Sequence, residues 1–451
     1  MRTLLVTLLS CIILLLSVPV PARGQDKVDQ LEAQIRQLQD QLRVLEQEVK
    51  SIKSHSEPAP QPPSTSEKKP SPADKKPSAV NFGERGLSVE SGGGDVRMNV
   101  RGYFQADNRT YLGDGNLDGT DTFLLRRIRP VLELTVFKDF EFRLMPDFAG
   151  DSATLFDAYF NWRILPEVQI LAGKVKSPTG LERLQSATAL MFPERGLPTS
   201  IVPNRDIGAE LHGNLLDDRL EYALGIFNGT QDGSSVVTDV DDGKDTAARV
   251  FARPFSSTPL KGLGVGVAGT YGNHEGTPSR YRTTGQQTFF RFAAGTVNDG
   301  RLWRLSPQGY YYYGPFGVLA EWAVSSQRLR NGEVRDDVRN HAWQVMGSLV
   351  LTGEENSYRG IRPRRNLNPS DGAWGAFEVV GRAGRLVIDK DAFPIFASPA
   401  GNSDKALNLG IGLNWYPNRS VRFSADYEVN RLATGGLRNE HTLFNRVQFA
   451  F

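Results

Sequence analysis

The sequence predicts an all-β fold: a 16-stranded antiparallel transmembrane β-barrel, preceded by an N-terminal α-helical coiled coil. Three observations support this prediction. The chain starts with a pattern typical of an export signal. A heptad pattern and a proline-rich stretch follow this signal. Residues 95–451 then alternate apolar with polar or ionic residues. Segments of about ten residues with one apolar and one ionic face are typical of a barrel that surrounds a wet lumen.

Residues 1–24 are predicted to be a secretory signal peptide. Arg2 precedes an apolar run over 4–18, and small residues follow at 22–24. The run is too short to span a membrane comfortably and lacks a charged stop-transfer flank. A lipoprotein signal is the alternative, because 8–11 (Leu-Leu-Ser-Cys) resembles a lipobox, but the apolar core continues well beyond it. Cys11 is the only cysteine, so the mature chain is expected to have no disulfide and no thiol site.

Residues 26–53 are predicted to form a coiled coil, because apolar residues recur at alternating spacings of three and four. The seam leaves the oligomeric state open. A single amphipathic helix packed on a domain is the alternative, but the neighbouring segment could not supply the packing surface. The seam consists of Val28, Leu31, Ile35, Leu38, Leu42, Leu45, Val49 and Ile52.

Residues 54–80 are rich in Pro, Ser, Lys and Glu. Such a composition cannot bury a core, so we expect an extended, semi-rigid spacer. The predicted order is therefore signal peptide, coiled coil, linker and barrel.

The period changes to two in the barrel region. In 155–164, for example, Phe156, Ala158, Phe160 and Trp162 are predicted to face lipid, and the residues between them to face the lumen. A soluble β-sandwich also alternates, but its outer faces rarely carry such long aromatic rows.

Sixteen strands can be placed with long loops at one end and short turns at the other, and an even number suits a membrane barrel. Only 354–373 is long at the short-turn end, and 287–296 is a candidate for a further strand. The predicted strands are 96–108, 123–137, 139–149, 154–164, 167–176, 205–216, 219–228, 246–255, 262–272, 303–313, 316–327, 340–353, 374–389, 404–416, 419–430 and 442–451.

The C-terminal strand alternates Leu443, Val447, Phe449 and the terminal Phe451. Such an ending resembles the signal that the barrel assembly machinery of the outer membrane recognises, so that machinery is an expected partner, together with outer-membrane lipid.

Basic residues recur at the predicted lumen positions of the first strands. Cations that line a narrow aqueous pore concentrate anions, and arginine offers a planar fork of donors to phosphate oxygens. Acidic residues such as Glu133 and Asp157 share these faces, so a neutralised charge lattice with weak selectivity is the alternative. The predicted pore-lining residues are Arg97, Arg101, Arg127, Arg129, Arg143, Arg163, Lys174 and Lys176.

Three stretches resemble the phosphate-selective porin O and P family. The first is Arg126-Arg127-Ile128-Arg129 with Phe137-Lys138-Asp139-Phe140-Glu141-Phe142-Arg143. The second, and most specific, is Gly173-Lys174-Val175-Lys176-Ser177-Pro178 with Met191-Phe192-Pro193-Glu194-Arg195. The third is Tyr312-Tyr313-Gly314-Pro315-Phe316-Gly317 with Glu321.

The resemblance, which spans most of 95–451, implies a sixteen-stranded barrel that assembles as a homotrimer, so it is not independent of the strand count. It also implies that the third outer loop, 177–204, folds inward and narrows the pore. Lys174, Ser177 and Asp147 then fall near anion-contacting positions, although Pro178 stands where the family has a serine-rich run. Arg280, Arg282 and Arg291 resemble the family's arginine-rich funnel.

The expected function is passive diffusion of small solutes through the outer membrane of a Gram-negative cell, with a preference for anions such as phosphate or polyphosphate. The alternative is a weakly selective general porin whose periplasmic coiled coil mainly tethers the outer membrane to the cell wall. No catalytic set, cofactor motif, metal site or nucleic-acid-binding pattern is apparent, so no enzyme is expected. The stretch 114–119 begins like a calcium loop, but Leu125 stands where its last ligand would be.

Overall fold

The computed structural model describes residues 79–83, 86–113, 117, 119–235, 238–239, 241–257 and 259–451. The predicted signal peptide and coiled coil, and the predicted linker up to residue 78, lie outside the described residues. Among the described residues, no helix is long and apolar enough to cross a membrane.

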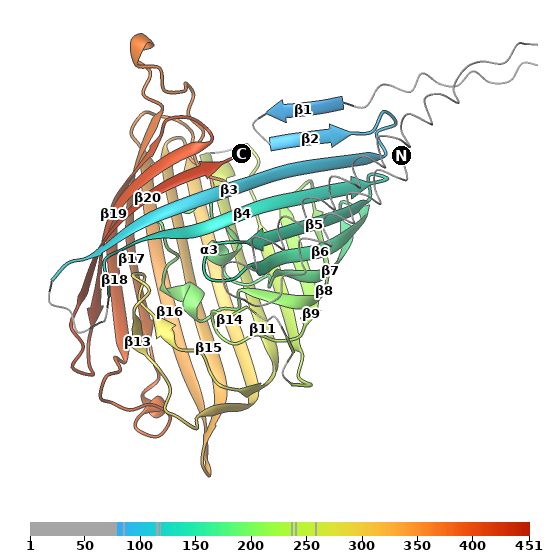
Figure 1. The fold of residues 1–451 in the computed structure, drawn as a ribbon. Coiled ribbons are helices and arrows are strands. Elements are labelled where there is room, and N and C mark those ends of the chain that lie inside the picture. Colours follow the sequence, from blue (N-terminus) through green and yellow to red (C-terminus); the bar gives the residue numbers. More distant parts are fainter. Residues whose placement is uncertain are drawn as a thin grey trace, which may run out of the picture. The chain divides into compact units, whose positions relative to one another are not determined.

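Sixteen antiparallel strands close into one barrel, because β20 pairs with β3 from Thr442↔Tyr111 to Ala450↔Tyr103 (Figure 1). The predicted number of strands is confirmed, and their ends differ by a few residues. The barrel strands are β3 (Val96–Tyr111), β4 (Thr122–Val136), β5 (Phe140–Asp147), β6 (Thr154–Leu165), β7 (Val168–Lys176), β8 (Arg205–Leu215), β9 (Leu220–Phe227), β10 (Asp245–Ala252), β11 (Leu263–Gly276), β14 (Val297–Tyr313), β15 (Phe316–Asn331), β16 (Val334–Val350), β17 (Ala376–Val387), β18 (Lys405–Tyr416), β19 (Val421–Leu432) and β20 (Glu440–Ala450).

Two short hairpins and five helical turns complete the described fold. β1 (Ala79–Gly83) and β2 (Gly86–Glu90) form a hairpin that pairs with the first residues of β3. β12 (Tyr281–Arg282) and β13 (Thr288–Phe290) form a separate two-stranded sheet, so the candidate strand at 287–296 is not part of the barrel wall. The helical turns are α3 (Leu181–Leu184), η1 (Leu197–Ser200), η2 (Pro259–Gly262), η3 (Pro369–Asp371) and η4 (Lys390–Ala392).

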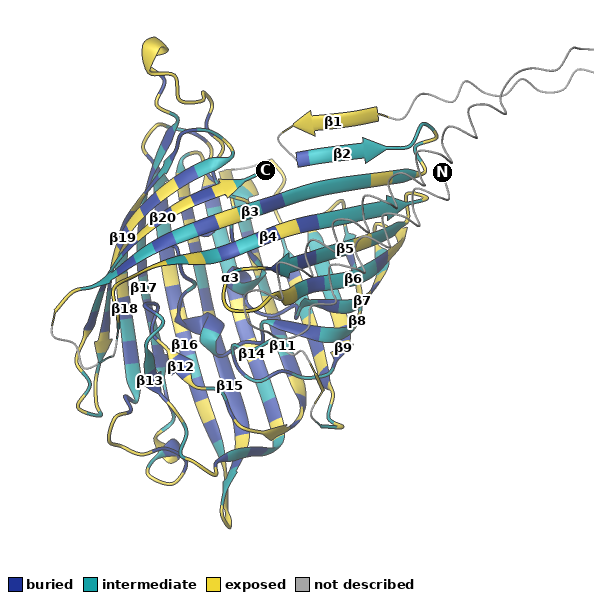
Figure 2. Ribbon diagram, viewed as in Figure 1, coloured by how far each residue is buried: buried dark blue, intermediate teal, exposed yellow. Residues whose placement is uncertain are grey.

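Burial alternates along the wall strands, as the period of two predicts (Figure 2). On β15, Glu321 and Ala323 are buried inside the barrel, whereas Trp322 between them is exposed on the outer face. Aromatic rings also stack across neighbouring strands of that face, with Trp415 5.3 Å from Phe423. An outward apolar and aromatic surface of this kind suits contact with lipid.

One end of the barrel, which we call the turn end, has mostly short connections. β14 and β15 are joined by Gly314 and Pro315, and Gly314 has φ +53°, a conformation that glycine adopts without strain. The connection 351–375 between β16 and β17 is the long exception, as the sequence indicated. The opposite end, which we call the loop end, carries the long loops.

An apolar core lies inside the barrel rather than between it and lipid. Segments 197–202, 281–290 and 388–397 pack together there against β15 to β18. Wall residues that contribute to it, such as Leu329 and Ala342, are fully buried. This core fills part of the lumen.

Candidate functional site: the pore constriction

The loop after β7, residues 177–204, folds into the lumen; we call it the constriction loop. Wall arginines hold its backbone. Arg382 Nη1 donates to Glu194 O at 2.8 Å, Arg422 Nη1 to Leu190 O at 2.7 Å and Arg446 Nη1 to Pro193 O at 2.6 Å. Guanidinium groups suit this task, because each offers five donors in a fixed plane.

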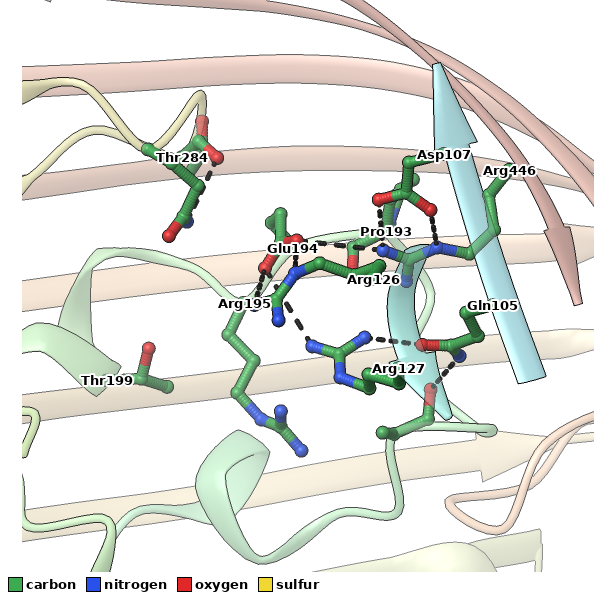
Figure 3. A network of polar contacts seen from close by, with 12 residues as sticks. Gln105, Asp107, Arg126, Arg127, Pro193, Glu194, Arg195, Thr199, Thr284 and Arg446 are labelled. Carbon is green, nitrogen blue, oxygen red and sulfur yellow. Dashed lines mark hydrogen bonds and ion pairs between the residues drawn. The ribbon is translucent and has the colours of Figure 1, made fainter. Parts of the chain in front are cut away.

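Glu194 ties the constriction loop to β3, β4 and β20 through four arginines, of which Figure 3 labels Arg126, Arg127 and Arg446. Its carboxylate lies 2.8 Å from Arg109 Nη2 and 2.5 Å from Arg126 Nε, and 3.8 Å from Arg127 Nη2 and 3.6 Å from Arg446 Nη2. Burial alone would raise the pKa of Glu194, but the guanidinium groups of Arg126, Arg127 and Arg109 outweigh it and hold this pKa well below its usual range. The loop is therefore fixed by a carboxylate that stays ionised.

A second attachment holds the loop against β15 and β16. Glu321 Oε2 accepts a hydrogen bond from Leu181 N at 2.7 Å, and Gln344 Nε2 donates to Glu182 Oε2 at 2.8 Å. A Cβ atom on Gly196 would come within 1.7 Å of Gln344 Oε1, so a larger residue there would displace the Gln344 side chain. The loop backbone thus lies directly on the wall.

A β-bulge brings Arg126 into the lumen. Gln105 of β3 pairs with Arg127, but Ala106 pairs with Leu125, so Arg126 is the extra residue. A bulge re-aims side chains locally, and here two consecutive arginines both reach Glu194. Strict alternation would have placed one of them toward lipid.

A polar cavity of about 750 Å³ lies between the constriction loop, β4 and the loop that carries β12 and β13. Seven arginines and only two carboxylates, Glu194 and Asp232, line it, with several hydroxyl groups. The arginines are Arg126, Arg127, Arg183, Arg195, Arg280, Arg282 and Arg291.

Arg183 and Arg195 are the two arginines of this cavity that belong to the constriction loop, and we call them the inner cations. Their guanidinium groups donate to backbone carbonyls, Arg183 to Thr199 and Arg195 to Glu182 and Gln185. Among the described residues, neither forms an ion pair with a carboxylate. Burial and neighbouring arginines lower the pKa of Arg183 to about 9; burial, only partly offset by Glu182, lowers that of Arg195 to about 10. Both guanidinium groups remain charged at neutral pH, and a bound anion would stabilise these buried charges.

Arg280, Arg282 and Arg291 line the same cavity from the loop between β11 and β14, so the structure brings these three predicted residues together. In the part of the chain that the structure describes, none of the three has a carboxylate partner. Burial, with the charges of Arg280 and Arg126, lowers the pKa of Arg282.

The predicted arginines near the turn end form ion pairs instead. Arg101 and Arg143 both contact Glu133, and Arg143 Nε lies 3.3 Å from Asp157 Oδ2. Arg97 pairs with Glu90 of β2 at 2.9 Å, and Arg163 with Glu141. Arg97, Arg143 and Arg163 line a second cavity of about 560 Å³. At the turn end, arginines and carboxylates therefore form the kind of charge lattice that the sequence offered as the alternative to an anion-preferring wall.

Arg129 and Asp147, also predicted, pair with each other at 2.7 Å between Nη2 and Oδ2. A second bulge, opposite Met145 and Pro146, turns Phe156 toward this pair. The Phe156 ring lies 3.8 Å from the Arg129 guanidinium and 4.4 Å from that of Arg205. The prediction that Phe156 faces lipid is therefore wrong, because the bulge breaks the alternation.

The remaining predicted residues lie at the base of the constriction loop. Lys176 Nζ donates to Leu184 O and Gln185 O, each at 3.0 Å, and so satisfies carbonyls at the end of α3. Ser177 N donates to Asn204 O at 3.3 Å, which joins the two ends of the loop. Lys174 is buried in β7 and lines neither of the two cavities described above.

Arg126, Arg183 and Arg195 are lining residues that sequence reasoning did not select. The adjacent pair Arg126-Arg127 was a usable signal, because two consecutive charges in a strand require a bulge or a membrane-facing cation. Arg183 and Arg195 gave no periodic signal, since they lie in a loop. Within the described ranges, no group of three or more His, Cys, Asp or Glu side chains could hold a metal ion.

Comparisons with known proteins agree with this geometry. Porin O of Pseudomonas aeruginosa is 24% identical over 381 residues, which cover 76% of this chain and 84% of that protein. The outer membrane channel DcaP of Acinetobacter baumannii has a TM-score of 0.53 at 12% identity and covers 79% of this chain and 97% of its own. The anion-selective porin from Comamonas acidovorans has a TM-score of 0.50 at 10% identity and covers 79% and 100%. At these low identities, the two structural similarities show that the barrel fold is shared.

The match to a porin family, together with the closed barrel, points to an outer-membrane channel protein rather than an enzyme. The family model for phosphate-selective porin O and P matches residues 98–451, most of the chain. The chain therefore belongs to the phosphate-selective porin O and P family.

Proposed function

We propose that this porin prefers anions, with phosphate and polyphosphate among its favoured solutes. The observation that carries the proposal is the cavity with seven arginines and two carboxylates. Fixed cations in a confined, water-filled space raise the local concentration of anions and repel cations. The name of the family and the anion-selective porin of similar fold support the same direction.

In this proposal, two groups of arginines have different roles in anion passage. Arg280 and Arg282, from the outer loop, attract an anion to the cavity. Arg183 and Arg195, on the constriction loop, then offer donors at the narrow part. A phosphate oxygen can accept from a guanidinium fork in two places. Transport requires the anion to leave again, and several weak sites in succession allow this better than one tight site.

Reversal potentials of the purified channel in planar bilayers, measured across a KCl gradient, test the proposal. We expect a potential of the sign that chloride permeation produces, and a chloride current that falls when phosphate is added. A potential of the sign that potassium permeation produces would contradict anion preference. Anion preference without any effect of phosphate would restrict the proposal to small anions in general.

A second candidate is a weakly selective porin whose coiled coil tethers the outer membrane to the cell wall. The ion pairs at the turn end favour it, because Arg101 and Arg143 share Glu133 there and their positive charge is partly neutralised. We propose that the turn end faces the periplasm and that the predicted coiled coil lies in the periplasm. Deleting 26–78 should leave conductance intact and weaken envelope integrity in detergent-sensitivity assays. Loss of conductance would argue against a separate tether.

We also propose assembly as a homotrimer in outer-membrane lipid, delivered by the barrel assembly machinery through the C-terminal strand. The family resemblance supports trimerisation, and the exposed aromatic surface supports contact with lipid. Phe451 exchanges two backbone hydrogen bonds with Gly102, at 3.0 and 3.1 Å, so it lies where the barrel closes. Light scattering in detergent tests the trimer. Deleting Phe451 should lower the amount that reaches the outer membrane.

A further inference from the structure

The long connection at the turn end, residues 351–375, enters the lumen. Asn356 fixes its first part to the wall, because its backbone N–H donates to Gly314 O at 2.8 Å and its Nδ2 donates to Ser348 Oγ at 2.6 Å. The chain then runs inward to Tyr358 and Gly360. We call residues 356–361 the strut.

The strut contacts the constriction loop at both ends of α3. Tyr358 Oη donates to Leu181 O at 2.6 Å, and Gln185 Nε2 donates to Tyr358 O at 2.8 Å. Gly360 has φ +96°, and a Cβ atom there would lie 3.4 Å from that of Ala189. Loop and strut therefore touch along several residues, not at one point.

The ring of Tyr358 is packed as firmly as its polar atoms. It stacks on Tyr310 of β14 with centroids 5.2 Å apart and an angle of 22° between the planes. It also packs against an apolar cluster that includes Leu181 and Phe192 of the constriction loop and Leu319 of β15. One side chain thus joins the turn-end connection, the wall and the loop.

Leu181 shows why this contact matters. Its N–H donates to Glu321 of the wall and its carbonyl accepts from Tyr358, so its two backbone groups are held by different parts of the barrel. α3 has only four residues and could not persist without such partners. Removal of the strut would leave the start and end of α3 without support from the turn end.

We propose that Tyr358 is a positioning residue for the pore: the strut holds the constriction loop from the turn end and thereby keeps the channel at one width. Tyr358 itself contacts no solute in this role. It acts through Leu181 and Gln185, which carry Arg183 between them. The width of the pore is therefore set from the turn end as well as by the Glu194 contacts with the wall.

Single-channel recording of the full-length protein in planar bilayers tests the proposal. We expect Tyr358→Ala to replace the single open level by several sublevels with increased open-channel noise. Tyr358→Phe keeps the ring but removes the bond to Leu181, so it should raise the noise less. The same substitutions at Tyr313, which ends β14 half exposed on the outer face, are the matched controls and should leave the trace unchanged.

Heat-dependent mobility in gels shows whether each variant has folded. If Tyr358→Ala does not fold, Tyr358→Phe decides, because it keeps the ring and removes the hydrogen bond from Tyr358 Oη to Leu181 O. A steady single level in the folded Tyr358→Ala variant, or in Tyr358→Phe where that one is needed, would overturn the proposal. Noise is measured independently of reversal potential, so this result and the failure of anion preference are distinguishable.

Discussion

The Glu194 carboxylate lies 2.8 Å from Arg109 Nη2, and both side chains are buried inside the barrel. Arg109 belongs to the first barrel strand and Glu194 to the constriction loop, so the pair joins the wall to the element that narrows the pore. Arg126 donates to the same carboxylate. One loop residue thus neutralises part of a strongly basic wall.

Replacement of Glu194 by glutamine should destabilise the protein. Breaking a buried ion pair by removing one partner costs roughly 3–5 kcal/mol, because the other charge stays buried. Thermal unfolding in detergent would measure the effect. Glu90→Gln is the matched control, since Glu90 pairs with Arg97 in an exposed position, where an ion pair contributes about 0–1 kcal/mol. Equal stability of the two variants would contradict the role assigned to Glu194.

The attachment of the constriction loop should resist mild acid. The folded pKa of Glu194 lies well below its ordinary value. A depressed folded pKa contributes stability that is present above the unfolded pKa and is lost as the pH falls through the folded pKa. Channel noise should therefore stay constant from neutral pH down to the ordinary pKa of glutamate and rise only below it. A rise centred on that ordinary pKa, absent in Glu194→Gln, would show that the carboxylate is not held as described.

The barrel strands were predictable because lipid on one side and water on the other impose a period of two. β17 and β20 show this period along most of their length. The interior of β15 did not follow it, since Leu319 and Leu329 are apolar yet face inward. Loops cover those residues, and a prediction that treats the lumen as water has no reason to place apolar side chains there.

The site was predictable only in part, for a different reason. Arg280 and Arg282 reach the cavity as the family resemblance implies. Arg126 and Phe156 reach the lumen through bulges, which insert one residue and shift the alternation. Arg183 reaches it through tertiary contacts of a loop whose path depends on residues far away in the sequence, such as Tyr358.

Neutralising the inner cations should weaken anion preference, whereas removing both members of an ion pair should not. In Arg183→Gln/Arg195→Gln, two charges without carboxylate partners are lost, so the reversal potential should shift toward that of potassium. The matched control is Arg143→Gln/Glu133→Gln, which removes an ion pair and leaves the net charge unchanged. Its reversal potential should equal that of the wild type. Equal shifts in the two variants would show that the cavity does not set selectivity.

Removal of the Tyr281 hydroxyl should loosen the outer loop that carries Arg280 and Arg282. Tyr281 Oη donates to Asp232 Oδ2 at 2.9 Å and accepts from Asn340 Nδ2 at 2.9 Å. Burial raises the pKa of Tyr281 well above its ordinary value, so the proton needed for donation stays in place. Tyr281→Phe leaves these buried partners unsatisfied, which costs about 1–3 kcal/mol.

Thermal unfolding and the reversal potential should therefore change together in Tyr281→Phe, with a lower midpoint and weaker anion preference. Tyr313→Phe provides the comparison, because its ring is half exposed on the outer face of the barrel. That variant should keep both values. If Tyr281→Phe lowered the midpoint but left the reversal potential unchanged, Arg280 and Arg282 would act on anions without help from the anchored loop, and the anion preference would have to depend on the constriction loop alone.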